Sequence, residues 1–184
     1  IKNPYEKGFV SYHQDAKYIG LEPHNWVTAW VAITDSNEKN GCMRMWSGSH
    51  KDDLKDHNQM FNEGNLLTRG QTVNNVPKEK VKPLILKAGQ MSLHHPKVVH
   101  GSEQNESNDR RIGFVIQSYI GTNVQQVLGI NNVQLARGLD EFNYHKKIGR
   151  PNSLMDKNDL KIKKLENNNL QEIFYKGSTK KGTY

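Results

Sequence analysis

Residues 25–34 read NWVTAWVAIT, a stretch rich in tryptophan and β-branched residues. Such residues are typical of a strand that packs against a core. Turn sequences such as Asn40-Gly41 and Ala88-Gly89 divide the surrounding chain into further short runs of the same kind. These strand-like runs cover residues 8–15, 42–46, 81–86, 90–93 and 110–120. The sequence therefore predicts a mainly β fold, either a sandwich or a jelly roll.

The length of 184 residues fits one domain, which we place at 1–184. Residues 51–80 are long, polar and poor in strand formers, so they are expected to form a lid or a surface insertion. Residues 158–175 have apolar residues at three- and four-residue steps, which predicts an imperfect amphipathic helix on the outside of the sheet. Residues 177–184 are expected to be a loose tail. Because Ile1 already leads into a strand, we expect an N-terminal part of the protein to precede it.

Charge and cysteine content narrow the range of partners. The formal net charge is +7 and the mean hydropathy is -0.84, but the lysines are scattered rather than interleaved with aromatic residues. Nucleic acid is therefore not the expected partner. No apolar run reaches the roughly 18 residues of a membrane span, so no membrane partner is expected either. The single cysteine, Cys42, suits a reducing compartment, and we expect the cytoplasm.

His13-Gln14-Asp15 places an imidazole and a carboxylate two residues apart. On a strand these two side chains point to the same face, so one metal ion can take both. A third ligand from a distant strand would complete a two-histidine, one-carboxylate triad, which leaves three positions of an octahedral iron open. Taken alone, the tripeptide is a weak signal, because a single histidine on a strand is more often a packed or exposed side chain.

The third ligand has to come from one of seven other histidines. Only His100 ends an apolar stretch and opens a polar segment that carries Ser102 and, further on, Arg111. A returning strand would bring Arg111 back beside His100, where a guanidinium could bind a carboxylate with two hydrogen bonds. A surface-exposed Arg111 remains an alternative interpretation. The seven candidates are His24, His50, His57, His94, His95, His100 and His145.

Strand alternation after the polar loop places Arg111 and Gly113 on the same face as Val115 and Gln117. A glycine beside the arginine would leave room for a small molecule. Ile112, Phe114, Ile116 and Ile120 share the other face, and periodicity alone would bury that face and expose the arginine.

From about residue 12 to residue 120 the sequence resembles the phytanoyl-CoA dioxygenase family of Fe(II)- and 2-oxoglutarate-dependent oxygenases. The matching motifs occur in the family's order: HQD at 13–15, VTAWVAI at 27–33, NGCMRMWSGSH at 40–50, AGQMSLHHPKVVHGS at 88–102, and N-x-S followed by RR at 105–111. Ser47 departs from the proline that the family usually has in that turn. The resemblance implies a double-stranded β-helix, or jelly roll, with flanking helices.

Carried over by residue, the resemblance makes His13, Asp15 and His100 the catalytic iron ligands. It implies that Arg111 binds the distal carboxylate of 2-oxoglutarate and that Ser102 supports that carboxylate. Trp30 matches a tryptophan that lines the cosubstrate pocket, although a plain core aromatic remains an alternative. Thr28 lies on the same strand face as Trp30 and is assigned to the same pocket.

The implied cofactors are Fe(II), 2-oxoglutarate as cosubstrate, and O2, with succinate and CO2 as products. Related halogenases have a small residue in place of the carboxylate, so Asp15 favours hydroxylation. The expected partner is a small-molecule substrate, a polar or anionic metabolite, and the oligomeric state is left open. Four residues are candidates for the mouth of the pocket: Lys17, Tyr18, His24 and Arg44.

Two other functions remain possible. One is a metal jelly roll of the cupin type that uses His94 and His95, although adjacent residues on a strand face opposite ways. The other is a non-catalytic metal-binding protein that keeps the fold and has lost turnover. All three ligands and Arg111 are present in this chain, which favours the oxygenase.

Overall fold

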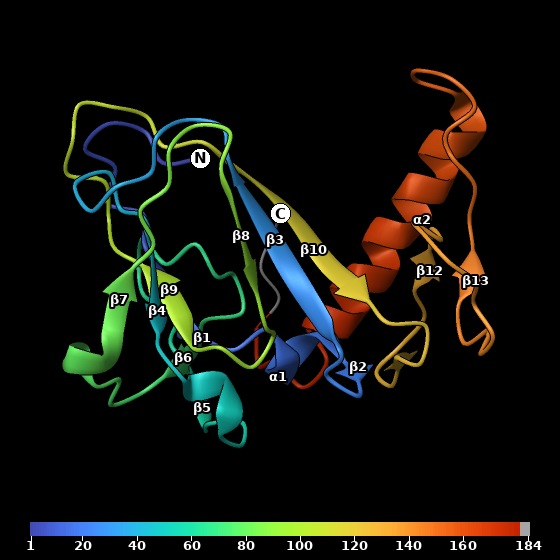
Figure 1. The fold of residues 1–184 in the computed structure, drawn as a ribbon, viewed down its shortest axis with the longest axis horizontal. Helices are drawn as coiled ribbons and strands as arrows, with labels where there is room; N and C mark the ends of the chain where they lie inside the picture. The colour runs from blue at the N-terminus through green and yellow to red at the C-terminus, as the bar shows by residue number, and fades with distance from the viewer. Residues whose placement is uncertain (181–184) are drawn as a thin grey trace.

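The computed structural model describes residues 1–180, in which two antiparallel sheets carry most of the regular structure (Figure 1). The first sheet has the strand order β10 (Gly113–Ile120), β3 (Trp26–Ala32) and β8 (Met91–His94). β3 is the central strand, as its composition predicts, since a strand with neighbours on both sides favours β-branched and aromatic residues.

The second sheet has the order β1 (Val10–His13), β9 (His100–Ser102), β4 (Met43–Trp46) and β7 (Val81–Pro83). β9 has only three residues but pairs with β1 on one side and β4 on the other. Each sheet therefore joins segments that are far apart in the sequence, as a jelly roll requires.

Shorter elements connect and flank the two sheets. Paired strands form three small ribbons: β2 (Leu21–Glu22) with β11 (Gln125–Gln126), β5 (His57–Gln59) with β6 (Gln71–Val73), and β12 (Asn132–Val133) with β13 (Lys146–Lys147). The helical elements are α1 (Ala16–Ile19), α2 (Lys157–Phe174) and two 3-10 turns, η1 (Ser49–Lys51) and η2 (Lys78–Lys80). Segment 51–80, which the sequence predicts to be a lid or insertion, thus includes the β5–β6 ribbon.

Two apolar clusters form the interior. One gathers Trp26 with Leu21 and Val124, and Phe174 from the end of α2 packs against it. The other gathers Trp30, Ala32 and Met43, and so joins β3 to β4 across the two sheets. The two tryptophans of β3 therefore each belong to a core cluster, and Trp30 lies on the same side as the site described below.

Three segments differ from the prediction. The strand expected over residues 8–15 ends at His13, and Asp15 is the N-cap residue that precedes α1. The apolar stretch that ends at His100 is not itself a strand, and His100 begins β9, which pairs with β1 and β4. In β10 the register shifts between Ile116 and Tyr119. As a result Ile120 packs with the inner cluster, and the prediction that it shares a face with Phe114 is wrong.

The helix predicted over 158–175 is α2, but it does not pack along the sheet as expected. The last turn of α2 lies beside α1, and the rest of the helix extends away from the sheets (Figure 1). Ile173 in this last turn is buried, whereas Leu160 and Leu165 are about half exposed. Three successive asparagines, 167–169, interrupt the apolar stripe and leave only the C-terminal end with an apolar face. No helix in residues 1–180 combines the length and apolarity that crossing a membrane requires. Of the predicted tail, residues 181–184 lie outside the described residues.

Candidate metal centre and cosubstrate pocket

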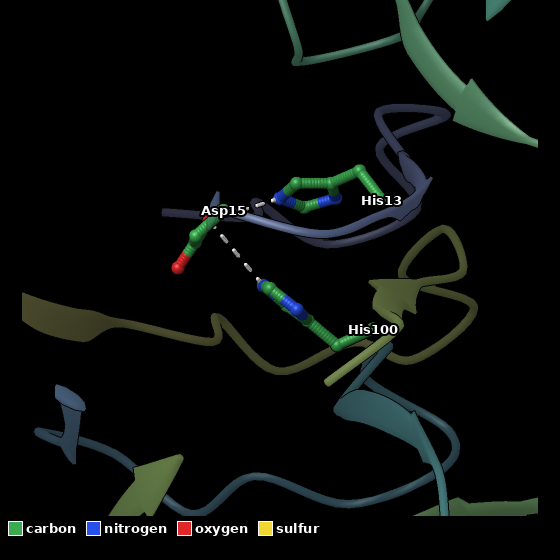
Figure 2. Close-up of side chains that lie close together, drawn as sticks. All are labelled: His13, Asp15 and His100. Atoms are coloured by element: carbon green, nitrogen blue, oxygen red, sulfur yellow. Dashed lines mark ion pairs between the residues drawn. The ribbon is translucent and has the colours of Figure 1, made fainter. Parts of the chain in front are cut away.

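His13, Asp15 and His100 form a tight buried cluster between β1 and β9 (Figure 2). His13 Nε2 lies 3.5 Å from Asp15 Oδ1, and His100 Nε2 lies 4.0 Å from the same oxygen. One possible ligand atom from each residue fits within 4.8 Å of the other two. In the described part of the chain this is the only group of three or more histidine, cysteine or carboxylate side chains with that geometry.

Strand pairing explains why residues so far apart in sequence meet. His13 and His100 are register partners across β1 and β9, so their imidazoles stand side by side with ring centroids 4.3 Å apart. Asp15 reaches them from the start of α1 rather than from the strand. The Ala16 N–H donates to the Pro96 carbonyl at 3.1 Å, which fixes the chain at this bend. The three side chains converge as the sequence predicts, although Asp15 comes from the start of α1 rather than from the strand.

The outward-facing atoms of the cluster already have partners in the protein. The Nδ1 atoms of His13 and His100 lie 2.8 Å and 3.0 Å from the carbonyls of Ser11 and Val98. A carbonyl oxygen only accepts, so each Nδ1 donates to its carbonyl and Nε2 is the ring nitrogen left to face an ion. The Thr28 hydroxyl donates to Asp15 Oδ2 at 3.1 Å. Such contacts orient metal ligands and leave Nε2 and Oδ1 available.

Electrostatics put His100 and Asp15 in the protonation states that a cation requires. Burial, followed by the neighbouring His13, lowers the pKa of His100 to about 3, so this imidazole is neutral at pH 7. Burial alone would raise the pKa of Asp15, but the His13 imidazole beside it and the nearby His100 hold that pKa below its ordinary range. An anionic carboxylate beside a neutral imidazole is a suitable donor set for a divalent metal ion.

A second group of polar atoms, around Arg111, has no hydrogen-bond partner within residues 1–180. Arg111 is 8% exposed, and its Nε and Nη1 atoms are buried without a hydrogen-bond acceptor. Ser102 Oγ is likewise buried and unpaired. The Trp30 ring lies under the guanidinium at 5.4 Å, and any side chain at position 113 would collide with that ring. Since unpaired buried donors are costly, this arrangement fits a site that an anionic ligand completes.

A cavity of about 410 Å³ joins the two groups. Its wall includes every residue that the sequence assigns to the metal and the cosubstrate: His13, Asp15, Thr28, Trp30, His100, Ser102 and Arg111. Arg111, Val115 and Gln117 all face it, as strand alternation predicts. The volume is within the usual range for a pocket that binds small molecules.

Comparison with known proteins agrees with this geometry. The family model described as phytanoyl-CoA dioxygenase (PhyH) matches residues 1–113. The chain belongs to the phytanoyl-CoA dioxygenase family. Human peroxisomal phytanoyl-CoA dioxygenase is 30% identical over 101 residues, which are 54% of this chain and 30% of the human protein. A probable alpha-ketoglutarate-dependent hypophosphite dioxygenase of Stutzerimonas stutzeri is 27% identical over 125 residues, 67% of this chain and 43% of that protein.

Among solved structures, the apo form of the non-heme monooxygenase ThoJ is similar, with a TM-score of 0.81 and 28% identity. The match covers 94% of this chain and 63% of ThoJ. The predicted jelly roll with flanking helices is thereby confirmed. The chain spans less than two thirds of each of these relatives.

Some cavity residues were not predicted from the sequence. Leu66, Leu67, Thr68 and Arg69 line the wall from the loop between β5 and β6, and Phe174 lines it from α2. Phe174 lies beyond the family match, which ends at residue 113. The β5–β6 loop has no strand periodicity that would predict where its side chains point. The only sequence feature that predicted a binding role for this loop was the length and polarity of residues 51–80, which does not single out individual residues.

Of the four residues expected at the mouth of the pocket, one lines the cavity. Tyr18 lines the cavity, whereas Lys17, His24 and Arg44 do not. Arg44 pairs instead with Glu38 at 2.7 Å.

His94 and His95, the pair that a cupin-type site would use, point in different directions, as strand alternation predicts. His94 is buried and lines the cavity, while His95 faces away and its ring contacts His50.

Proposed function

We propose that this chain is an Fe(II)- and 2-oxoglutarate-dependent dioxygenase that hydroxylates a small polar or anionic metabolite and releases succinate and CO2. One observation carries the proposal: ligand atoms of His13, Asp15 and His100 converge within 4.8 Å of one another, in the wall of a cavity that Arg111 also lines. Two imidazoles and one carboxylate on one side of an ion are typical of non-heme Fe(II) oxygenases.

The residues present fit both implied cofactors. His13, Asp15 and His100 would hold the iron and leave its remaining positions open toward the cavity, where 2-oxoglutarate and O2 bind. The bound iron supplies the oxidising chemistry, in which one oxygen atom of O2 enters the substrate and the other enters succinate. Arg111 and Ser102 would bind the distal carboxylate of 2-oxoglutarate, because their buried donors lack any protein acceptor.

The chain itself contributes orientation and exclusion of water. Trp30 holds the Arg111 guanidinium against its ring, and Thr28 fixes the rotation of the Asp15 carboxylate. Val10, Met43 and Phe174 add apolar wall to the cavity. A low-polarity wall strengthens the contacts to a charged cosubstrate and keeps bulk water from the reacting atoms. Asp15 occupies the ligand position that a halogenase would leave to chloride, which supports hydroxylation.

Anaerobic titration with Fe(II) and 2-oxoglutarate tests the proposal directly. A weak visible metal-to-ligand charge-transfer band should appear with the wild-type protein and be absent in His100→Ala. Admission of O2 together with a substrate should then yield succinate in proportion to hydroxylated product. Metal binding without any 2-oxoglutarate band would instead support the alternative, a non-catalytic cupin-like metal protein.

The proposed compartment is the cytoplasm, supported by the buried free thiol of Cys42. Some relatives are described as peroxisomal, so fractionation of cells that express the full-length protein is the test.

A further inference from the structure

A second arginine, Arg69, lines the cavity that contains the triad. Its guanidinium carbon lies 4.5 Å from the centroid of the Tyr18 ring. Tyr18 belongs to α1 and lies one helical turn from the metal cluster, since its N–H donates to the Asp15 carbonyl at 3.1 Å. Arg69 is therefore held beside the helix that carries Asp15, while Arg111 approaches the cavity from the start of β10.

The contacts that hold Arg69 orient it but do not neutralise it. Its Nη1 donates to the Phe174 carbonyl and its Nη2 to the Lys176 carbonyl at 2.6 Å, both at the C-terminal end of α2. Carbonyl oxygens at a helix end carry only partial charge. Nε is buried without an acceptor, and no carboxylate in residues 1–180 forms an ion pair with this side chain. Arginine keeps its proton at neutral pH even when burial lowers its pKa, as it does here.

The charges that line the cavity are unbalanced. Among the described residues that line the wall, Asp15 is the only acidic one, against the two arginines Arg69 and Arg111. In the proposed enzyme a divalent metal ion adds two positive charges and 2-oxoglutarate adds two negative ones. With both bound, the excess is one positive charge, and Arg111 is already occupied by the cosubstrate. Arg69 supplies the charge that remains without a partner.

We propose that Arg69 is an anion-binding residue for the substrate and that the substrate is an organic carboxylate or phosphonate. The anionic group would bind the free N–H groups of Arg69, while the part to be hydroxylated extends toward the triad. Leu67 and Phe174, next to Arg69 in the wall, would contact the apolar portion of such a molecule. This inference rests on the proposed function, because it takes the other end of the cavity to be filled by 2-oxoglutarate.

Isothermal titration of protein loaded with Ni(II) and saturating 2-oxoglutarate tests this without turnover. The probes are hexanoate, butylphosphonate and the neutral analogue hexanamide. We expect at least one of the two anions to bind about tenfold more tightly than hexanamide, the factor that a single charged contact typically provides. Preference for hexanoate or for butylphosphonate then tells a carboxylate from a phosphonate substrate. Equal affinity of all three probes, or no binding, would overturn the proposal.

Variants locate the binding site. Arg69→Gln should remove the preference for anions, Arg69→Lys should retain part of it, and the exposed Arg137→Gln should leave it unchanged. Circular dichroism identifies any variant that fails to fold, in which case the probe comparison on the wild-type protein still decides. The Fe(II)–2-oxoglutarate band should persist in Arg69→Gln. A wild-type protein that forms the band but does not prefer anions would refute the role of Arg69 while leaving the oxygenase proposal intact.

Discussion

The triad and the Arg111–Ser102 group, called here the two ends of the cavity, differ in how many of their polar atoms have hydrogen-bond partners in the described residues. At the triad, Ser11, Val98 and Thr28 each bind the far side of a ligand residue, so only atoms that face the ion position remain free. At Arg111 and Ser102, the donors are buried and unpaired. The first end is therefore organised before anything binds, whereas the second depends on its ligand to complete the hydrogen bonds. Substitutions at the two ends should have separable effects.

The largest effect is expected for His100→Ala. Loss of one of three ligands should lower Fe(II) affinity by a factor on the order of 1,000 and abolish succinate formation. Titration with Fe(II) under anaerobic conditions measures the affinity. His95→Ala is the matched control, since His95 lies outside the cavity, and it should bind metal normally. Undiminished metal affinity in His100→Ala would exclude the triad.

Arg111→Gln should affect the cosubstrate and spare the metal. Loss of a charged, bidentate contact should raise the Kd for 2-oxoglutarate roughly 100-fold, since hydrogen bonds to charged groups contribute about 1.5–3 kcal/mol each. The apo protein should lose little stability, because the variant removes a buried charge that has no counter-ion. The charge-transfer titration gives the Kd and thermal unfolding gives the stability. Weakened Fe(II) binding in this variant would contradict the separation of the two ends.

A smaller effect is expected for Thr28→Val, which keeps the shape of the side chain and removes the hydroxyl that binds Asp15 Oδ2. Contacts that orient metal ligands typically contribute 10- to 100-fold in affinity, and we expect about tenfold for Fe(II). Thr72→Val is the control, because the Thr72 hydroxyl, in β6, donates to the Gly70 carbonyl two residues before it and lies outside the triad. If both variants bound Fe(II) equally well, the triad would not need this support.

The last effect is absent at neutral pH and concerns the stability of the protein in acid, through His57. Burial lowers the pKa of His57 to about 4, and its Nε2 accepts the Gln14 N–H at 3.0 Å. The unfolded chain, with a pKa near 6.5, binds this proton first. Stability should therefore be complete above about pH 6.5 and fall as the pH drops toward 4, by at most about 1.4 kcal/mol per pH unit for one proton. Urea unfolding of wild type and His57→Gln across this window should show a shallower slope for the variant.

Sequence reasoning was most informative where chemistry is encoded in short spacings. The pair His13 and Asp15, and the alternation that places Arg111 and Gly113 on one face, are local patterns, and the structure brings these residues to one cavity. The bend after His13 was not predicted, because it depends on a hydrogen bond from Ala16 to the distant Pro96. Arg69 was missed for a similar reason: its direction is set by carbonyl groups more than 100 residues later.

The register that opposes His13 to His100 has a mechanical consequence. An ion bound to both imidazoles would act as a removable cross-link between β1 and β9, closing the chain between residues 13 and 100 into a loop. Closing a long loop restricts the unfolded chain, and binding to the folded state alone shifts the equilibrium further. The melting temperature should then depend on the free metal concentration. A chelator should lower it by removing the cross-link between the two strands.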